Sequence, residues 1–345
     1  MAAFRDILAA TSGATPTIVL SEGADPRVAE AAVAASVANL AKIICIGDPA
    51  LVQPALAAAG SVGDIAIEDP ATSPRLPGYI ADYVRKRAAK GMTPEKAQLE
   101  LSQANFFAAA MVAAGDADGT IGGAVYSTPD IIRAALKVIG TAEGTKLLSS
   151  FFFMLFEDRP DLPSPVNVFT DCGLVIDPSA EELADIAISS AESMRCLTGL
   201  EPKIAMLSFS TRGSAKHANV TKVSQATAMV QAARPDLVVD GELQFDAAMV
   251  PSVGAAKAPG SPVAGQANIF VFPNLDAGNI GYKIAQRFGG AKAIGPILHG
   301  LARPANDLSR GCTADDIIDM ICVTAAQAAV DRKSTRLNSS HYHQS

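Results

Sequence analysis

Four segments rich in glycine, serine and proline are the places where this chain could bind an anion. They lie at residues 120–130, 208–217, 256–265 and 306–312. Small residues let backbone N–H groups approach a phosphate closely, and a helix that begins after such a segment adds a favourable partial charge. Ordinary turns between strands and helices have the same composition, so each segment alone is compatible with both interpretations. None has the Gly-x-Gly-x-x-Gly pattern or a Walker lysine, so nicotinamide or ATP chemistry is not predicted.

The cysteines and histidines do not form a metal-binding or disulfide pattern. The five cysteines are scattered, odd in number and without a Cys-x-x-Cys pair, which is typical of a reducing compartment. Two of the four histidines, His341 and His343, lie at the very end of the chain. The other two, His217 and His299, are predicted to be structural, and we expect no metal.

The elements that would position these segments alternate between short apolar strands and helices. Residues 17–20 and 42–46 are apolar runs of strand length, each followed by a turn and a helix-forming stretch. This alternation predicts a parallel sheet covered on both faces, with ligands bound beyond the carboxyl ends of the strands. Further strands are predicted at 147–156, 166–170, 204–208, 237–239, 269–272 and 293–298, and helices at 28–40, 79–89, 94–114, 128–139, 180–197, 220–233, 277–288 and 315–330.

Length and composition bound the class of protein. With 345 residues and roughly 150 residues per domain, two domains are expected. A hydrophobic fraction of 49% against 18% charged residues excludes a disordered chain and a coiled coil. The net charge of -7 and the absence of Trp argue against a nucleic-acid partner. A polyanionic ligand would therefore need a few local cations.

No segment of the chain predicts secretion or insertion into a membrane. The first eight residues lack the apolar core of a signal peptide. The most apolar run, 147–156, is shorter than the about 20 residues that cross a bilayer. We expect a cytoplasmic protein with no membrane partner. Residues 331–345 are polar and aperiodic, and they are predicted to form a disordered tail that does not look native.

Four long motifs of the chain are SFSTRGSAKH at 208–217, KAPGSPVAG at 257–265, PNLDAGNIGY at 273–282 and NDLSRGC at 306–312. Three shorter ones are SEG at 21–23, STPDIIR at 127–133 and DGELQ at 240–244. Together these motifs resemble the phosphate acetyl/butyryltransferase family, and phosphate acetyltransferase most closely. The resemblance extends from residue 18 to residue 330 in the family's order.

The resemblance implies reversible transfer of an acetyl group between coenzyme A and inorganic phosphate, by direct thiolate attack in a ternary complex. It implies two α/β/α (three-layer) domains with mostly parallel sheets, an active-site cleft between the domains, and a homodimer. The first domain would combine residues 1–148 and 300–330, and the second would be 149–299. No permanently bound cofactor is expected, because coenzyme A is a substrate. The expected partners are small-molecule substrates.

The resemblance also assigns site residues. It places the catalytic groups at Ser309, Arg310 and Asp316, and the coenzyme-binding arginines at Arg87 and Arg133. The basic run around Arg87 is less dense than the family's, so Arg85 is an alternative.

The chemistry needs these residue types. A thiol is mostly protonated at neutral pH, so a general base assists its attack on acetyl phosphate, and Asp316 is the proposed base. Ser309 would hold the sulfur or the developing oxyanion, and Arg310 would grip the phosphate. An aspartate beside an arginine is a weak base, so we expect proton transfer to be concerted with attack.

Structural interpretations stand beside these roles. The run Thr-Ala-Asp-Asp that ends at Asp316 is a capping-box pattern, so this residue is predicted to cap the last helix as well. Cys312 is a possible nucleophile, although a small buried thiol is the favoured interpretation. The run FFFMLF at 151–156 fits either a dimer interface or a core strand.

Two other functions remain open from the sequence. Phosphate butyryltransferase is the nearest alternative, because the acyl pocket is not visible in the sequence. A non-catalytic acyl-CoA-sensing module, of the kind that resembles this family behind malic enzymes, is the second. Binding of acetyl-CoA without turnover would indicate the module.

Overall fold

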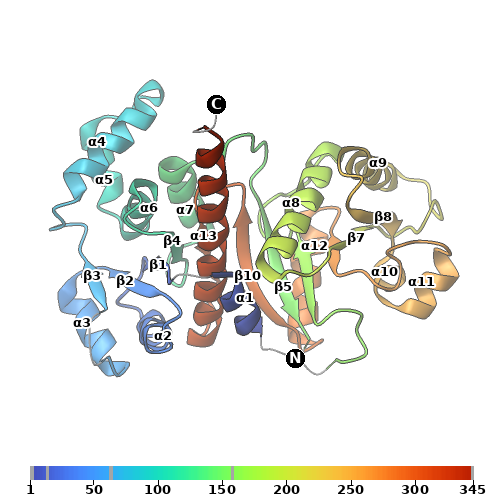
Figure 1. Ribbon diagram of the computed structural model, residues 1–345, viewed down its shortest axis with the longest axis horizontal. Coiled ribbons are helices and arrows are strands. Elements are labelled where there is room, and N and C mark those ends of the chain that lie inside the picture. The colour runs from blue at the N-terminus through green and yellow to red at the C-terminus, as the bar shows by residue number, and fades with distance from the viewer. Residues whose placement is uncertain (1–3, 13–14, 62–64, 157–158, 343–345) are drawn as a thin grey trace. The chain divides into compact units, whose positions relative to one another are not determined.

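The chain is described from a computed structural model, which covers residues 4–12, 15–61, 65–156 and 159–342. It forms two compact units (Figure 1). The first unit is discontinuous and comprises Met1–Thr145 and Leu301–Ser345, while the second is Lys146–Gly300. Both are α/β, so the predicted fold class is confirmed.

The first unit is built on a five-stranded sheet in which every pair of neighbours is parallel. The strand order is β11-β4-β1-β2-β3, so the chain runs outward from β1 and then returns to its other side. Such a reversal leaves the carboxyl ends of β1 and β4 open to a ligand. The strands are β1 (Thr17–Leu20), β2 (Lys42–Ile46), β3 (Ala66–Glu68), β4 (Gly119–Gly122) and β11 (Ala305–Asp307).

Helices cover both faces of this sheet. The helix α6 is buried from Asn105 to Val112, because its alanines and phenylalanines pack directly against the strands. One face carries α1 (Phe4–Ser12), α2 (Pro26–Val37), α3 (Pro49–Ala58) and α13 (Ala314–Tyr342), and the other carries α4 (Leu76–Arg87), the 3-10 turn η1 (Ala88–Lys90), α5 (Pro94–Leu101), α6 (Ala104–Ala114), α7 (Thr128–Ala134) and the π-helical segment η2 (Ala135–Ile139).

An Asp-Pro pair starts two of these helices. The Asp25 side chain accepts a hydrogen bond from the N–H of Arg27, and the Asp48 side chain accepts one from the N–H of Ala50. In each case proline occupies the first turn, where its missing N–H costs nothing.

Two expectations about helices are corrected. The helix predicted at 94–114 is two helices, because α5 ends at Leu101 and the Ser102 hydroxyl donates back to the Gln98 carbonyl. The predicted disordered tail is wrong for the backbone up to Tyr342, where α13 ends. No glycine or proline occurs between 331 and 342, so the backbone has no residue that stops the helix.

The second unit has a mixed six-stranded sheet in the order β10-β5-β6-β9-β7-β8. The strands β6, β9, β7 and β8 are parallel, while β5 is antiparallel to both of its neighbours. Its strands are β5 (Ser149–Leu155), β6 (Val166–Thr170), β7 (Lys203–Leu207), β8 (Val238–Leu243), β9 (Ile269–Val271) and β10 (Lys292–His299).

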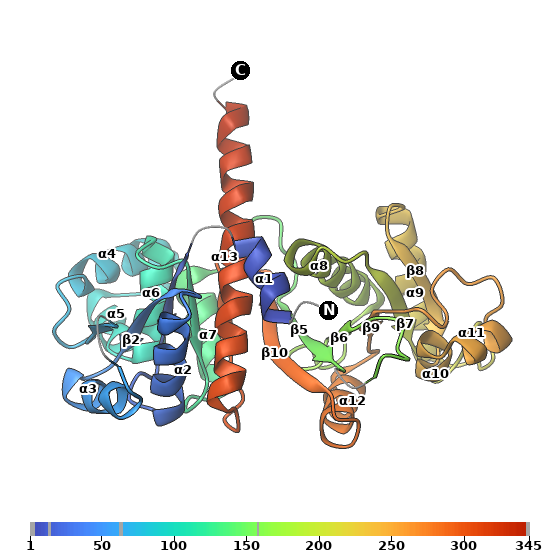
Figure 2. The same ribbon diagram turned by 60° about the horizontal axis from the view of Figure 1, so that its bottom comes forward.

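Helices also cover both faces of the second sheet, as Figure 2 shows. Between them, every residue of β5 is buried. The apolar run 151–155 is therefore a core strand, and the dimer-interface interpretation of it is wrong. One face carries α8 (Ala180–Thr198) and α9 (Ala218–Ala233), and the other carries α10 (Phe245–Met249), α11 (Pro251–Lys257) and α12 (Leu275–Arg287). In the part of the chain that the structure describes, no helix is both long and apolar enough to span a membrane.

Candidate active site

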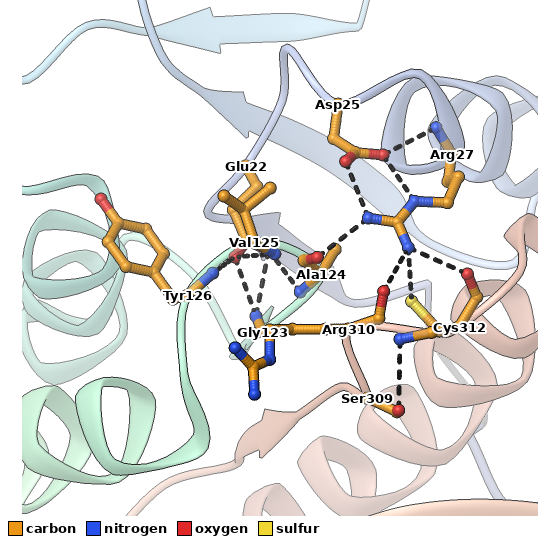
Figure 3. Close-up of polar contacts among 11 residues, drawn as sticks. Glu22, Asp25, Arg27, Gly123, Ala124, Val125, Tyr126, Ser309, Arg310 and Cys312 are labelled. Atoms are coloured by element: carbon orange, nitrogen blue, oxygen red, sulfur yellow. Dashed lines mark hydrogen bonds and ion pairs between the residues drawn. The ribbon is translucent and has the colours of Figure 1, made fainter.

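Three loops of the first unit meet at the carboxyl ends of its central strands (Figure 3). They follow β1, β4 and β11, which are neighbours in the sheet and point in the same direction. The loop after β11 carries the predicted catalytic pair Ser309 and Arg310. The site therefore lies where a parallel sheet places its ligands.

The segment 309–312 forms a tight turn. The Cys312 N–H donates to the Ser309 carbonyl at 2.9 Å, and the Gly311 N–H donates to Ser309 Oγ at 3.3 Å. The side chains of Ser309 and Arg310 are exposed. Since Ser309 Oγ accepts a bond from Gly311, its own O–H remains available to a ligand. No hydrogen bond or ion pair joins the Arg310 guanidinium to any residue within the described ranges.

Asp316 lies in the first turn of α13 and caps it. Its Oδ2 accepts hydrogen bonds from the Thr313 N–H at 2.8 Å and the Thr313 hydroxyl at 2.9 Å. The Asp316 N–H donates in return to the Thr313 hydroxyl at 3.2 Å. The capping box expected from the sequence is therefore present. All of these carboxylate bonds use Oδ2, and Oδ1 accepts none from the residues described.

An arginine that sequence analysis missed joins the three loops. Arg27, in the first turn of α2, donates from Nε and Nη2 to the Asp25 carboxylate at 3.0 and 2.8 Å. Its Nη2 also donates to the Ala124 carbonyl at 2.9 Å. Its Nη1 donates to the carbonyls of Arg310 at 2.8 Å and Cys312 at 3.1 Å. One side chain thus bridges the loops after β1, β4 and β11.

A buried carboxylate fills the glycine-rich loop after β4. Glu22, in the loop after β1, is only 9% exposed and accepts hydrogen bonds from four consecutive backbone N–H groups. Its Oε1 binds Val125 at 2.9 Å and Tyr126 at 2.8 Å, its Oε2 binds Ala124 at 3.1 Å, and both oxygens are 3.0 Å from the N–H of Gly123. This loop does bind an anion, but that anion is the chain's own Glu22.

Asp307 is a second buried acid beside the site. It ends β11, is 1% exposed, and accepts a hydrogen bond from the Thr128 hydroxyl on Oδ2 at 2.5 Å. Burial, together with the nearby charge of Glu22, raises the pKa of Asp307 to about 7. Gly123 has a φ of 112°, and a Cβ there would lie 2.3 Å from Asp307 Oδ1. Glycine is therefore required for the two loops to approach this closely.

Cys312 is a buried thiol. It is 7% exposed, and burial raises its pKa above the ordinary value for cysteine. A thiol whose pKa is raised carries little of the thiolate that a nucleophile needs. The geometry therefore favours the structural interpretation of Cys312.

The two predicted coenzyme-binding arginines lie on α4 and α7 of the first unit, and both of these helices contact α6. Arg87 ends α4, lines a pocket of about 460 Å³, and donates to the Lys137 carbonyl at 3.3 Å. Arg133, on α7, is 53% exposed and pairs with Asp130. The alternative residue, Arg85, is 75% exposed, pairs with Asp82 in the same helix and does not line this pocket.

The histidines have structural partners. His217 caps α9, since its Nδ1 accepts a hydrogen bond from the Asn219 N–H at 3.1 Å. His299 is buried and stacks on Phe151, and burial lowers its pKa to about 3, so its ring is neutral. Among the described residues no cluster of three or more His, Cys, Asp or Glu side chains could hold a metal.

In the second unit, the glycine-rich segment 208–217 is also bound by the chain's own acids. Glu242 Oε1 accepts a hydrogen bond from the Gly213 N–H at 2.7 Å, and Arg212 pairs with Asp240 at 2.6 Å. Backbone donors that composition suggested for a phosphate therefore hold this loop to β8 instead.

Glu22 and Arg27 were not predicted from the sequence as site residues. Glu22 belongs to the short SEG match at 21–23, which was the available signal for it. Arg27 follows an Asp-Pro helix start and had no signal beyond that position.

The comparisons with known proteins agree with this geometry. A family model described as Phosphate acetyl/butaryl transferase matches residues 3–325. The chain is 50% identical over 311 residues to the phosphate acetyltransferase of Paracoccus denitrificans, which covers 90% of this chain and 94% of that protein. It is 44% identical over 328 residues to the phosphate acetyltransferase of Thermoanaerobacterium thermosaccharolyticum, covering 95% and 100%.

A solved structure gives the same result. A phosphotransacetylase from Streptococcus pyogenes aligns with a TM-score of 0.87 at 45% identity, over 94% of this chain and 99% of that one. The resemblance predicted from the motifs is thereby confirmed. The chain belongs to the phosphate acetyl/butaryl transferase family.

Proposed function

We propose that this chain is a phosphate acetyltransferase, which moves an acetyl group reversibly between coenzyme A and inorganic phosphate. The observation that carries the proposal is the exposed Ser309–Arg310 turn at the carboxyl ends of the central strands. Its relatives support the acetyl reaction over the butyryl one, because those at 44–50% identity are named phosphate acetyltransferases. Comparing turnover of acetyl phosphate with that of butyryl phosphate measures this preference directly.

In the direction of thioester formation, the sulfur of coenzyme A attacks the carbonyl carbon of acetyl phosphate. A C–S bond forms, the C–O bond to phosphate breaks, and the phosphate leaves with the electron pair of that bond. The thiol proton passes to Asp316, whose Oδ1 is not used by the helix cap. Concerted transfer suits this acceptor, because a separate ionisation of the thiol is unfavourable at neutral pH.

The two exposed groups of the turn then act on charge that develops in the transition state. The Ser309 hydroxyl donates to the carbonyl oxygen as it becomes an oxyanion. The Arg310 guanidinium, which is unpaired with the described residues, binds two phosphate oxygens and neutralises the leaving group. The reaction needs no resident cofactor, because the acyl group passes directly between two substrates.

Coenzyme A brings phosphates to a protein whose net charge is -7. The pocket beside Arg87 is also lined by Lys86, Lys90 and Lys137, so it concentrates positive charge. We assign the coenzyme phosphates to Arg87 and Arg133, with Arg87 preferred to Arg85 because it lines the pocket.

The test is formation of acetyl-CoA from acetyl phosphate and coenzyme A by the purified chain. Ser309→Ala, Arg310→Gln and Asp316→Asn should each lower kcat at least tenfold. The matched control is Asp315→Asn, which alters the preceding, exposed aspartate and should stay within twofold of wild type. No turnover by a folded chain that binds acetyl-CoA would support the sensing module instead.

The cap and base roles of Asp316 can be separated. Asparagine still offers an oxygen to the Thr313 N–H, so Asp316→Asn should keep the melting temperature while losing turnover. Thr313→Ala should lower stability by about 1 kcal/mol, because the capping partner is lost, and should retain most turnover. Wild-type kcat in Asp316→Asn would rule out the base role.

We also propose a homodimer in which α12 pairs with the same helix of a second copy. Ile280, Ile284 and Phe288 recur every fourth residue and are 57%, 55% and 92% exposed. An antiparallel two-fold pairing centred between the two isoleucines would bury this stripe and set Asp276 opposite the partner's Arg287. The acidic first turn and the basic last turn of the helix are therefore complementary across the two-fold axis.

Sedimentation of the wild type and Ile284→Asp tests the homodimer. The wild type should sediment as a dimer at micromolar concentration and Ile284→Asp as a folded monomer. Leu99→Asp, at a 72% exposed position on α5, should remain dimeric. A monomeric wild type would overturn this assembly.

We propose that the protein works in the cytoplasm. Its five cysteines are unpaired, which fits a reducing compartment.

A further inference from the structure

All five N–H groups of the Arg27 guanidinium donate hydrogen bonds to other groups of the protein. The Nε–H and one Nη2–H hold the carboxylate of Asp25, and the second Nη2–H holds the carbonyl of Ala124. The two Nη1–H groups hold the carbonyls of Arg310 and Cys312. A guanidinium has only five donors, so none remains for a substrate.

Two of the three carbonyls that Arg27 binds, those of Arg310 and Cys312, flank Gly311 at the tip of the catalytic turn. Within the described part of the chain, the other hydrogen bonds of residues 309–312 stay inside the turn itself. The turn is anchored before it by the Leu308 N–H, which donates to the Gly122 carbonyl at 2.8 Å. It is anchored after it by the cap at Thr313. Between these anchors, Arg27 is the group from another element that holds the turn.

Asp25 fixes the direction in which Arg27 points. Its carboxylate lies flat against the guanidinium through two hydrogen bonds, and its Oδ1 also accepts from the Arg27 N–H at 2.9 Å. The Arg27 guanidinium lowers the pKa of Asp25, which keeps the carboxylate charged. The side chains are 13% exposed for Asp25 and 32% exposed for Arg27, so this pair is partly shielded from water. A bidentate pair of this kind is directional, which a lysine could not reproduce.

We propose that Arg27 is a positioning residue for catalysis, acting through the Ser309–Arg310 turn rather than on a substrate. This inference rests on the function proposed above. By holding the carbonyls on both sides of Gly311, Arg27 keeps the Ser309 hydroxyl and the Arg310 guanidinium in one arrangement. Small displacements of such groups reduce rate far more than they reduce substrate binding.

Kinetics of two variants test the inference. Arg27→Met keeps much of the side-chain volume without donors, and Arg27→Lys keeps the charge with a different geometry. Both should lower kcat at least tenfold while the KM for coenzyme A stays within threefold. Arg303→Met, which removes an exposed arginine from the same unit, should keep kcat within twofold. Arg27→Ala should regain at least threefold in kcat when guanidinium ion is added at a non-denaturing concentration.

A second readout does not depend on activity. Cys312 is 7% exposed, and its Sγ lies 4.0 Å from Arg27 Nη1. Loosening the turn should therefore expose this thiol, and Arg27→Met should be alkylated at Cys312 by iodoacetamide at least tenfold faster than wild type. Cys196 is exposed, so it should be alkylated at the same rate in both proteins and serves as the internal control. Cys322 is buried in α13 and should stay unlabelled while the fold is intact.

The outcomes separate the inference from the proposed function. Wild-type kcat in folded Arg27→Met, or a raised KM with unchanged kcat, would overturn the positioning role. Unchanged labelling of Cys312 would also overturn it. If the wild type itself makes no acetyl-CoA, the proposed function fails, while the labelling result still decides whether Arg27 holds the turn.

Discussion

Replacing Glu22 by glutamine perturbs one buried carboxylate that organises the loop after β4. Four backbone N–H groups point at its two oxygens over 2.8–3.1 Å. A glutamine amide offers one oxygen, and its NH₂ group would face N–H donors on the other side. Whichever way the amide turns, at least the Ala124 N–H, or those of Val125 and Tyr126, lose their acceptor.

The loss of stability expected for Glu22→Gln follows from these contacts. A buried N–H left without an acceptor costs about 1–3 kcal/mol, and hydrogen bonds to a neutral acceptor are roughly half as strong as those to a carboxylate. We therefore expect Glu22→Gln to destabilise the first unit by about 2–4 kcal/mol. For a domain of about 200 residues this corresponds to a fall in Tm of roughly 5–15 °C.

Thermal and urea unfolding followed by circular dichroism measure this effect. The matched control is Glu30→Gln, which removes the same charge from an exposed position on α2. That control should change stability by less than about 0.5 kcal/mol. If Glu22→Gln melts within 1 °C of the wild type, the loop does not depend on this carboxylate and the reasoning is refuted.

Three further predictions concern Asp307, Cys312 and the coenzyme pocket. The folded pKa of Asp307, about 7, exceeds its ordinary 3.8, so folding takes up a proton between these values. The free energy of unfolding of the wild type, relative to that of Asp307→Asn, should therefore fall as pH rises from 4 to 7 and stay level above pH 7. The total fall is up to ~4 kcal/mol, at ~1.4 kcal/mol per pH unit. Urea unfolding of both proteins at pH 4.5, 6 and 8 measures this, and a stability difference that does not change with pH contradicts it. Cys312→Ser should keep at least a third of wild-type kcat in the acetyl-CoA assay, whereas a thousandfold loss would restore the acyl-enzyme route. Arg87→Gln should raise the KM for coenzyme A at least fivefold and leave the KM for acetyl phosphate unchanged, whereas Arg85→Gln should change neither KM. The reverse result would indicate that Arg85, and not Arg87, binds coenzyme A.

Local patterns predicted much of the fold. The strands β1, β2 and β6 have the bounds expected from their apolar runs, because a strand buried on both faces is continuous in hydrophobicity. The three-residue strands β3 and β11 were not predicted, since so short a run carries no period. They form strands because β2 and β4 offer them unpaired edges.

The sequence alone predicts the family that the chain resembles and the side chains that are proposed to react. Ser309 and Arg310 belong to one contiguous motif, and Asp316 reveals its capping role through a partner three residues away. Such information is local, so it can be read along the chain.

The contacts that hold the site together are visible only in the folded protein. Arg27 is separated by 283 residues from Arg310, and it binds the carbonyl oxygen of that residue rather than its side chain. Glu22 likewise binds the backbone N–H groups of the loop after β4. Every residue type except proline has the same backbone donor and acceptor, so no side-chain pattern marks these partners. Parallel strands bring them to one edge of the sheet, and that placement exists only after folding.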